Sequence, residues 1–250
     1  KAIRRKVYDK LMQAFGGNLK YLIIGGAALN HEVEKCLKQI KFPYCVGYGM
    51  TECAPLIAYT PWNEFKIRSC GRIVDRMEVK IDSENPQKVV GEILVKGDSV
   101  MNGYYKNQAA TDAIFTEDGW MKTGDLGVID AQGNIFIRGR NKNMILSGNG
   151  QNIYPEEIEA KLNNLPFVME SLVIDKDGKL YGLVYPDYEA VDAAGINSAE
   201  LEVAMEDNRK ELNSQVAAYE GLSKIILHPE EFEKTPKKSI KRYLYANIPV

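Results

Sequence analysis

Hydrophobic positions in the first fifty residues change twice between helical and strand-like spacing. One helical face is predicted by apolar residues that recur every four positions, namely Ile3, Val7, Leu11 and Phe15. A buried strand is predicted within 19–26, and Asn30 is a suitable N-cap for a second helix. A further apolar run at 42–49 then predicts another strand. This order of helix, strand, helix and strand favours a parallel pair of strands.

Between residues 56 and 140 the pattern becomes one of short strands separated by Gly, Asn and Asp turns. It predicts a β-rich subdomain, with a short helix at 107–115 and strands at 77–81, 91–97, 126–130 and 134–139. Beyond Arg140, a polar, glycine-bearing stretch at 141–152 has the composition of a linker. Pro155 marks a helix start, and further elements are expected at 167–174, 179–185, 198–217 and 224–229.

Composition excludes several classes of protein. The 250 residues are 45% hydrophobic and 26% charged, which is ordinary for a globular protein. A net charge of −2 gives no basic surface for nucleic acid. Apolar runs are strand-sized, whereas a membrane span needs roughly 20 residues. Four cysteines without CxxC spacing and only two histidines argue against a structural zinc site.

The loop "GYGMTE" at 47–52 carries side chains that could bind a nucleotide. It does not match the Rossmann fingerprint, because Glu52 stands where that fingerprint has its third glycine. The sequence also lacks a GxxxxGK[ST] loop and a GxSxG elbow. The loop carries an aromatic ring at Tyr48 for stacking, a hydroxyl at Thr51 for phosphate and a carboxylate at Glu52 for magnesium. On its own, a tight turn between buried strands is the simpler interpretation.

Two further segments carry candidate binding residues. In "WMKTGDLG" at 120–127, Asp125 could accept hydrogen bonds from both ribose hydroxyls, or it could satisfy its own turn in a hairpin. In 133–159, Arg140 and Lys142 lie at the predicted junction of two subdomains, where arginine suits phosphate or ribose. The alternative for this pair is an exposed basic linker.

Taken in order, these motifs resemble the adenylate-forming superfamily of acyl-CoA synthetases, luciferases and peptide-synthetase adenylation domains. The similar segments are "GGAAL" at 25–29, 47–52, "GEILVKGDSVMNGYY" at 91–105, 120–127 and 133–159. "GQNIYPEEIE" at 150–159 and "FEKTPKKSIKRYLY" at 232–245 are most similar to bacterial long-chain fatty acid–CoA ligases.

The resemblance implies an α/β (α+β) multidomain fold and covers the C-terminal part of such a ligase. Residues 1–55 are expected to end an α/β adenylate-binding subdomain, 56–140 to form a β-barrel subdomain, and 141–250 to form a small mobile domain. The family's phosphate loop, TSGTTGxPK, does not occur in this sequence. The isolated chain is therefore expected to lack ligase activity.

The resemblance also implies a two-step reaction that uses ATP, Mg²⁺ and CoA as co-substrate. A fatty acid carboxylate attacks the α-phosphate to give acyl-AMP and pyrophosphate, and the CoA thiol then displaces AMP. Tyr48 would stack on adenine beside Gly49, Thr51 would contact the α-phosphate, and Glu52 would hold magnesium. Asp125 would bind the ribose hydroxyls with help from Arg140.

The resemblance implies further roles for three residues of a glycine turn and for two residues of the C-terminal domain. Gly25, Gly26 and Ala27 would let the backbone approach the nucleotide. Lys142 would be the hinge about which the small domain rotates between the two steps, and Gly150 would lie in a loop that faces the active site during thioester formation.

One position departs from the family pattern (K)TxxGKI, whose lysine bridges the carboxylate and the phosphate during adenylation. Ser239 stands at that lysine and Lys238 at the preceding glycine. A serine has no charge to neutralise a developing oxyanion, so the hypothesis is that Lys238 takes the catalytic role. The alternatives are Lys241 after a local register change, or adenylation that is assisted differently. A further alternative is a merely solvated basic tail, which comprises Lys234, Lys237, Lys238, Lys241 and Arg242.

Two other functions stay open alongside a fatty acid–CoA ligase. One is a fatty acyl–AMP ligase that hands the acyl group to a carrier protein, and the other is a non-catalytic fragment. A cytoplasmic location is expected, without nucleic acid and without a transmembrane span, although peripheral association with a membrane is compatible with this class.

Overall fold

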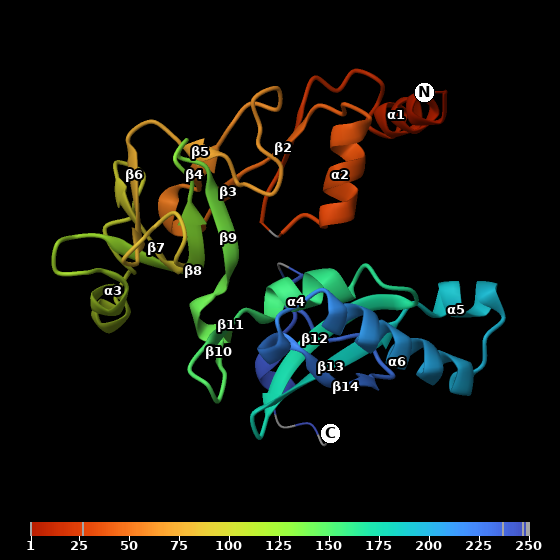
Figure 1. Ribbon diagram of the computed structural model, residues 1–250. Coiled ribbons are helices and arrows are strands. Elements are labelled where there is room, and N and C mark those ends of the chain that lie inside the picture. The colour runs from red at the N-terminus through yellow and green to blue at the C-terminus, as the bar shows by residue number, and fades with distance from the viewer. Residues whose placement is uncertain (1, 27, 237, 247, 249–250) are drawn as a thin grey trace. The chain divides into compact units, whose positions relative to one another are not determined.

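The computed structural model describes residues 2–26, 28–236, 238–246 and 248. It divides into two compact units, Lys1–Asn141 and Lys142–Val250. Figure 1 shows the helices and strands of both units, and each unit has hydrophobic clusters of its own.

The first unit begins with the predicted order of helix, strand, helix and strand. These elements are α1 (Ala2–Ala14), β1 (Leu22–Ile24), α2 (His31–Gln39) and β2 (Tyr44–Val46). β1 and β2 pair in parallel, which confirms that expectation. Asn30 caps α2 as predicted, because its side-chain oxygen accepts from the backbone N–H groups of Glu32 at 2.9 Å and Val33 at 3.2 Å.

Two antiparallel sheets form the rest of this unit. The smaller contains β3 (Tyr48–Gly49), β4 (Leu56–Tyr59) and β5 (Arg72–Ile73). The larger contains β6 (Met77–Asp82), β7 (Gly91–Gly97), β8 (Met121–Ile129) and β9 (Ile135–Arg140), with α3 (Gln108–Ile114) in the β7–β8 connection. Residues of both sheets share one core, which includes Ile57, Ile93 and Ile135.

The expected β-barrel is wrong for the part of the chain that the structure describes. The large sheet has the order β6-β7-β8-β9 and leaves β6 and β9 unpaired with each other. It is linked to the small sheet by an isolated bridge between Arg72 and Asn134, beside which Ile135 forms backbone hydrogen bonds with Cys70 and Gly71. The strands therefore form two open sheets that bury their apolar faces against one another. Because this packing already covers the apolar faces, the sheets do not have to close into a barrel.

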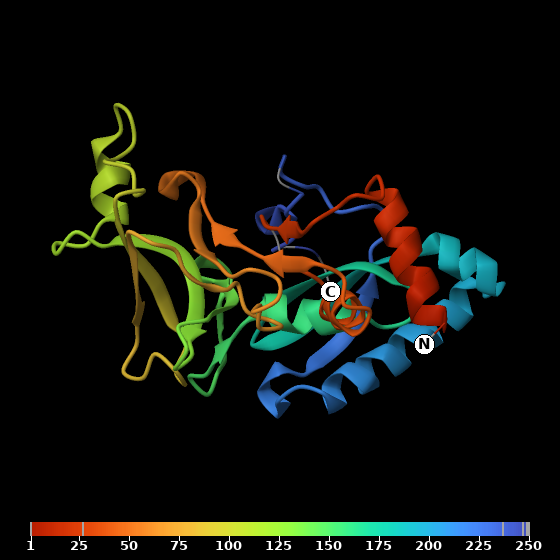
Figure 2. The same ribbon diagram turned by 90° about the horizontal axis from the view of Figure 1, so that it is seen from above.

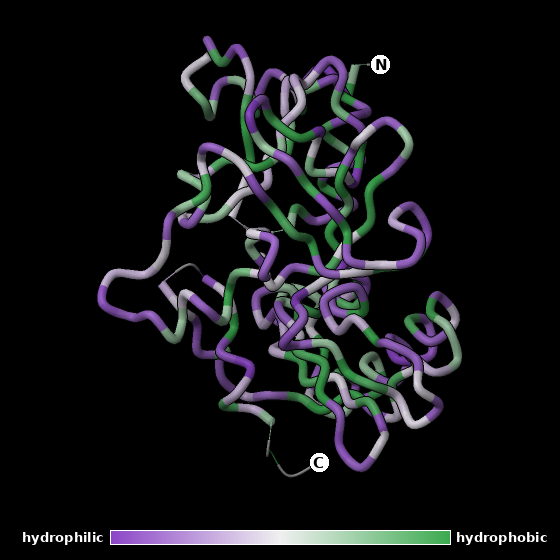
Figure 3. The backbone as a smooth tube through the Cα atoms, turned by 90° about the vertical axis from the view of Figure 1, so that its left-hand side faces the viewer, coloured by the Kyte–Doolittle hydropathy of each residue, from purple (hydrophilic) through white to green (hydrophobic). Residues whose placement is uncertain are grey.

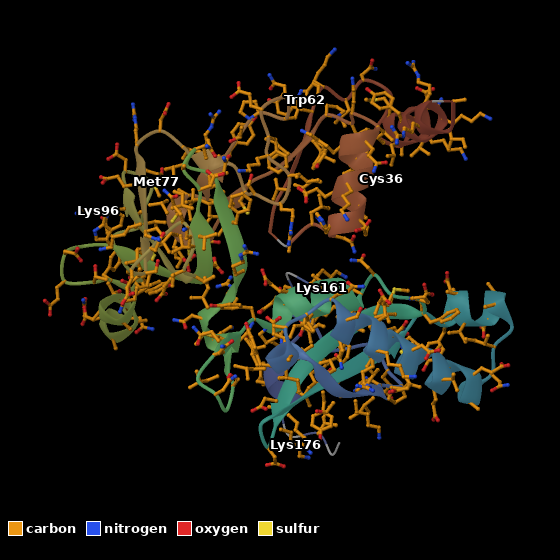
Figure 4. All side chains as sticks on the ribbon, in the orientation of Figure 1. Cys36, Trp62, Met77, Lys96, Lys161 and Lys176 are labelled. Carbon is orange, nitrogen blue, oxygen red and sulfur yellow. The ribbon has the colours of Figure 1, made fainter. Side chains whose placement is uncertain are left out.

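A three-stranded sheet organises the second unit, in the order β12 (Val168–Lys176), β13 (Lys179–Pro186) and β14 (Leu222–Leu227). Its helices are α4 (Pro155–Leu162), α5 (Tyr188–Ala194) and α6 (Ser198–Ser214). α4 and α6 pack on one face of the sheet, and Figure 2 shows α6 running alongside β14. Lys161, labelled in Figure 4, joins the two helices by donating to the Gln215 carbonyl at 2.9 Å.

The C-terminal segment covers the opposite face of this sheet. Side chains of β12 alternate between the two faces, so Val173 joins the helices while Leu172 and Ile174 pack with Phe232 and Tyr245. The short helix η4 (Arg242–Leu244) follows in this segment. The stretch predicted as a polar linker instead contains a small antiparallel hairpin of β10 (Ile145–Leu146) and β11 (Asn152–Ile153).

Hydropathy follows this arrangement within each unit, since apolar segments form the strands and polar segments occupy many of the turns (Figure 3). Among the described helices, none combines the length and the apolar character that a bilayer crossing requires.

Replacing Asp130 by asparagine is expected to destabilise the first unit by about 1–2 kcal/mol at pH 7. Burial alone would raise the pKa of Asp130, but the Lys66 ammonium and the N–H groups of Asn134 and Gln132 outweigh it and lower the pKa to about 2. Because this pKa is depressed, the stabilisation is present above the unfolded value and is lost as pH falls from about 4 towards 2. Urea unfolding of both proteins between pH 7 and pH 3 measures this difference.

Exposed Asp112 provides the control, and its replacement by asparagine should shift stability by no more than about 0.5 kcal/mol. A constant difference between the Asp130 variant and the parent across this pH range would contradict the assignment.

Candidate active site

The loop after β2 is fixed by backbone contacts rather than by glycine flexibility alone. Gly47 donates to the Ile24 carbonyl at 2.9 Å, and Met50 donates to the Pro55 carbonyl at 2.8 Å. At Gly49 a side chain is excluded, because a Cβ would lie 2.1 Å from the Pro55 oxygen. The chain then enters the short helix η1 (Thr51–Cys53), with Thr51 exposed and Glu52 half-buried.

Tyr48 connects this loop to the second predicted motif. Its hydroxyl donates to Asp125 Oδ2 at 2.7 Å, across 77 positions of sequence. The tyrosine is only 6% exposed and belongs to the core. Burial, followed by the nearby Asp125 carboxylate, raises the pKa of Tyr48 far above its usual value, so the phenol stays a neutral donor. The predicted stacking of its ring on adenine stays a prediction.

Asp125 lies within β8, so the alternative of a hairpin turn at this position is wrong. It is paired with Arg140 in the β8–β9 register, and Arg140 Nε approaches Asp125 Oδ1 to 2.8 Å. Its own N–H donates to Thr123 Oγ1 at 3.1 Å, and the Thr123 hydroxyl in turn donates to the Ile93 carbonyl at 2.7 Å. Residues from β3, β8 and β9 thus fix the carboxylate in one orientation.

Glu52 is positioned by a residue to which the sequence analysis gave no role. The Tyr104 hydroxyl donates to Glu52 Oε1 at 2.9 Å. A similar supporting residue is Glu92, whose Oε1 accepts from the Gly124 N–H at 3.0 Å beside Asp125. Both supporting residues lie in the segment 91–105 that carried the family resemblance. The signal was therefore present, but motif spacing did not show which residues these side chains contact.

The glycine turn after β1 lies against the loop of Tyr48. A Cβ on Gly25 would lie 3.3 Å from the Gly47 carbonyl oxygen, and Gly26 has a φ of +89°. Both glycines are exposed. Ala27, the third predicted residue of this turn, lies outside the described residues.

The remaining predicted residues belong to the second unit. Lys142 begins this unit and is exposed. Gly150, with a φ of +79°, lies in a turn closed by the Ser147 and Gln151 backbones at 2.9 Å. This turn borders a cavity of about 240 Å³, with Lys179 and Tyr219 among its lining residues.

Lys238 lies in a tight turn of the C-terminal segment. Its N–H donates to the Thr235 carbonyl at 2.8 Å, and its φ of +63° is left-handed, a conformation that glycine adopts most readily. This backbone agrees with an alignment that places Lys238 at the family's glycine and Ser239 at its lysine. Among the described cations of this segment, Lys238 forms no recorded ion pair, although it lowers the pKa of Glu231 together with Lys234, which has the larger effect.

The other described cations of this segment are paired. Lys234 Nζ is 2.7 Å from Glu170, Lys241 Nζ is 3.0 Å from Glu233, and Arg242 contacts Glu159. A fully solvated basic tail is therefore the wrong description of Lys234, Lys241 and Arg242.

Comparison with known proteins agrees with these motifs. The profile of one family, described as AMP-binding enzyme, matches residues 3–105. A long-chain-fatty-acid–CoA ligase of Mycobacterium bovis is 31% identical, in an alignment that covers 97% of this chain and 42% of the relative. A 2-succinylbenzoate–CoA ligase of Listeria monocytogenes is 36% identical over 94% of this chain and 48% of its own length.

Solved structures give the same result. ATP-bound MatB from Rhodopseudomonas palustris has a TM-score of 0.77 and 26% identity, covering 95% of this chain and 48% of that one. O-succinylbenzoate CoA synthetase (MenE) from Bacillus subtilis, in complex with ATP and magnesium ion, has a TM-score of 0.74 and 26% identity, covering 94% and 49%. The chain thus spans less than half the length of these relatives. Its sequence and fold place it in the AMP-binding, adenylate-forming superfamily.

Proposed function

We propose that the protein containing this chain is an ATP-dependent acid–CoA ligase. The cluster of Tyr48, Asp125 and Arg140 carries this proposal, because it fixes a buried carboxylate between two donors in the first unit. A carboxylate can accept about four hydrogen bonds. The ribose hydroxyls of a nucleotide are the ligand groups that such an acceptor suits.

The other nucleotide contacts follow from the same unit. Tyr48 and Gly49 would line the adenine, the exposed Thr51 hydroxyl would donate to the α-phosphate, and the turn of Gly25 to Ala27 would allow close backbone approach. Arg140 would hold Asp125 in place while adding positive charge near the phosphates. Catalysis would then consist of orienting the carboxylic acid and the α-phosphate and stabilising charge on the phosphates.

Glu52 fits a magnesium–nucleotide complex. Among the described residues, no group of three His, Cys, Asp or Glu side chains is gathered that could hold a metal by itself. Mg²⁺ is ordinarily held by one or two carboxylates together with substrate phosphates and water. A single carboxylate at the loop that would hold phosphate meets this requirement. The ion, when bound, would supply neutralisation of phosphate charge.

The second unit would supply the groups that differ between the two half-reactions. Lys142 would serve as the hinge, the turn of Gly150 would face CoA, and Lys238 would replace the lysine absent at Ser239. Lys238 is favoured over Lys241 because Lys241 Nζ forms an ion pair with Glu233 at 3.0 Å, whereas Lys238 has no recorded ion pair in the described part of the chain.

The similarity to known ligases suggests two candidate acids as the acyl substrate. A long-chain fatty acid is favoured by the similarity to the mycobacterial ligase, which aligns with 97% of this chain. 2-Succinylbenzoate is favoured by the higher identity, 36%, to the Listeria enzyme. The acceptor is CoA in the names of both relatives, which favours CoA over a carrier protein.

The test is a coupled assay of AMP release by the protein containing this chain, with ATP, Mg²⁺, CoA and each acid in turn. We expect AMP release that depends on one of the two acids and on CoA, with matching formation of the thioester. Acid-dependent pyrophosphate release without thioester formation would instead favour an acyl–AMP ligase, whose acceptor is a carrier protein rather than CoA. If AMP and ATP fail to bind at all, the proposed function is wrong.

A further inference from the structure

We propose that Tyr104 is a positioning residue that holds the Glu52 carboxylate in the orientation needed to meet a magnesium–nucleotide complex. This inference rests on the proposed function, in which Glu52 holds the ion. The observation behind the inference is the hydrogen bond from the Tyr104 hydroxyl to Glu52 Oε1 at 2.9 Å, which joins residues 52 positions apart in the sequence.

The backbone of Tyr104 is anchored at the start of α3. Its N–H donates to Thr111 Oγ1 at 2.9 Å, and its carbonyl accepts from the Asn107 N–H at 3.2 Å. The preceding Gly103 packs so closely on Thr111 that a Cβ there would lie 2.7 Å from the threonine methyl. The backbone from which the Tyr104 ring extends is therefore fixed by its contacts with Asn107 and Thr111.

The segment that carries Tyr104 is also tied to the backbone of Glu52. The Met101 N–H donates to the Glu52 carbonyl at 2.8 Å. Main chain and side chain of Glu52 are thus both bonded to residues 101–104. With Oε1 held by the phenol, Oε2 would be the carboxylate oxygen that meets the ion.

A phenol is suited to this task because it orients a carboxylate without cancelling its charge. A lysine or arginine in the same place would form an ion pair and compete with a cation. A phenol donates its hydrogen bond as a neutral group, so it does not compete with a cation for the carboxylate.

Tyr105 is the matched control that the chain itself provides. It is the next residue and also a tyrosine, but it is 88% exposed, whereas Tyr104 is 36% exposed. Replacement of either by phenylalanine removes one hydroxyl and leaves the ring. Both variants should therefore fold, and a difference between them reports on the contact with Glu52.

The experiment compares Tyr104→Phe, Tyr105→Phe and Glu52→Gln in the protein containing this chain. Binding of Mn²⁺ to the protein–ATP complex is followed by electron paramagnetic resonance, and binding of AMP without metal is measured by calorimetry. Removing a group that orients a metal ligand ordinarily weakens metal affinity by about 10–100-fold. We expect Tyr104→Phe to weaken Mn²⁺ binding at least about tenfold, with AMP affinity and thermal unfolding unchanged, and Tyr105→Phe to match the parent.

The outcomes separate this inference from the proposed function. If Glu52→Gln weakens Mn²⁺ binding and Tyr104→Phe does not, the positioning role is wrong while the metal role of Glu52 stands. If Glu52→Gln leaves Mn²⁺ binding unchanged, both assignments fail. A loss of AMP affinity in Tyr104→Phe would show that the tyrosine shapes the nucleotide pocket, and this too would overturn the inference.

Discussion

Replacing Asp125 by alanine is expected to weaken AMP binding by the protein containing this chain by about 100-fold, since hydrogen bonds to a charged group contribute roughly 1.5–3 kcal/mol each. The substitution removes the proposed ribose acceptor. It also leaves the buried Tyr48 hydroxyl and Arg140 without the partner they contact at 2.7 and 2.8 Å. Calorimetric titration with AMP measures the change, and acid-dependent pyrophosphate release should fall with it.

A second aspartate in the same unit supplies the control. Asp98 is exposed, so Asp98→Ala should bind AMP like the parent. The comparison is made on variants whose unfolding midpoints have been measured, because losing the Tyr48 and Arg140 contacts also weakens the first unit. Unchanged AMP affinity in Asp125→Ala would remove the central residue from the proposed site.

Replacing Arg242 by alanine is expected to destabilise the second unit by about 3–5 kcal/mol, because it leaves a buried carboxylate without its cation. Arg242 contacts Glu159 of α4, which is 8% exposed and also accepts from the Val173 N–H at 2.7 Å. Burial raises the pKa of Glu159 to about 7, and Arg242 opposes that rise. Hydrogen exchange of β12 and β14 amides reports the stability of this unit separately from the first.

The pH dependence of this variant has a definite sign. Without Arg242 the pKa of Glu159 rises further above its unfolded value. Glu159 is then neutral at low pH, and stability is lost as pH rises through the folded pKa. The destabilisation should thus be larger at pH 9 than at pH 6. Lys210→Ala, which removes an exposed pair with Asp207 at 3.3 Å, should cost no more than about 0.5 kcal/mol, and an equally small effect in Arg242→Ala would contradict the prediction.

Most helices and strands were predictable from the sequence, because the patterns that predict them involve only neighbouring residues. The apolar spacing of α1, the Asn30 cap and the proline at the start of α4 each report on a few neighbouring residues. The parallel pairing of β1 with β2 followed from the alternation of helix and strand. Element boundaries moved by a few residues, as where one strand predicted at 42–49 became β2 and β3.

Errors arose where the outcome depended on distant partners. The polar composition of 141–152 suggested a linker, but the pairing of β10 with β11 forms a hairpin there. Asp125 had the sequence context of a turn, but pairing with Arg140 places it inside a strand. The barrel expectation failed because periodicity indicates which face of a strand is buried and leaves open which strands pair at the edges.

The sequence predicted which residues are candidates for the site, but it did not predict which other residues hold them in place. Motif order named Tyr48, Glu52 and Asp125 as candidates. It could not show that Tyr104 holds Glu52 or that Glu92 holds Gly124, because those contacts join segments about 50 and 30 positions apart. Such pairs become visible only when the fold brings the segments together.

The contacts around Asp125 have a consequence for the thermodynamics of binding. Folding already fixes this carboxylate through Tyr48, Arg140 and the backbone bond to Thr123. An arriving nucleotide thus meets an acceptor that is preorganised, and it does not have to immobilise that side chain, which would otherwise cost about 0.5–1.5 kcal/mol. The entropy of ordering this side chain is lost once, during folding, rather than at every encounter with a ligand.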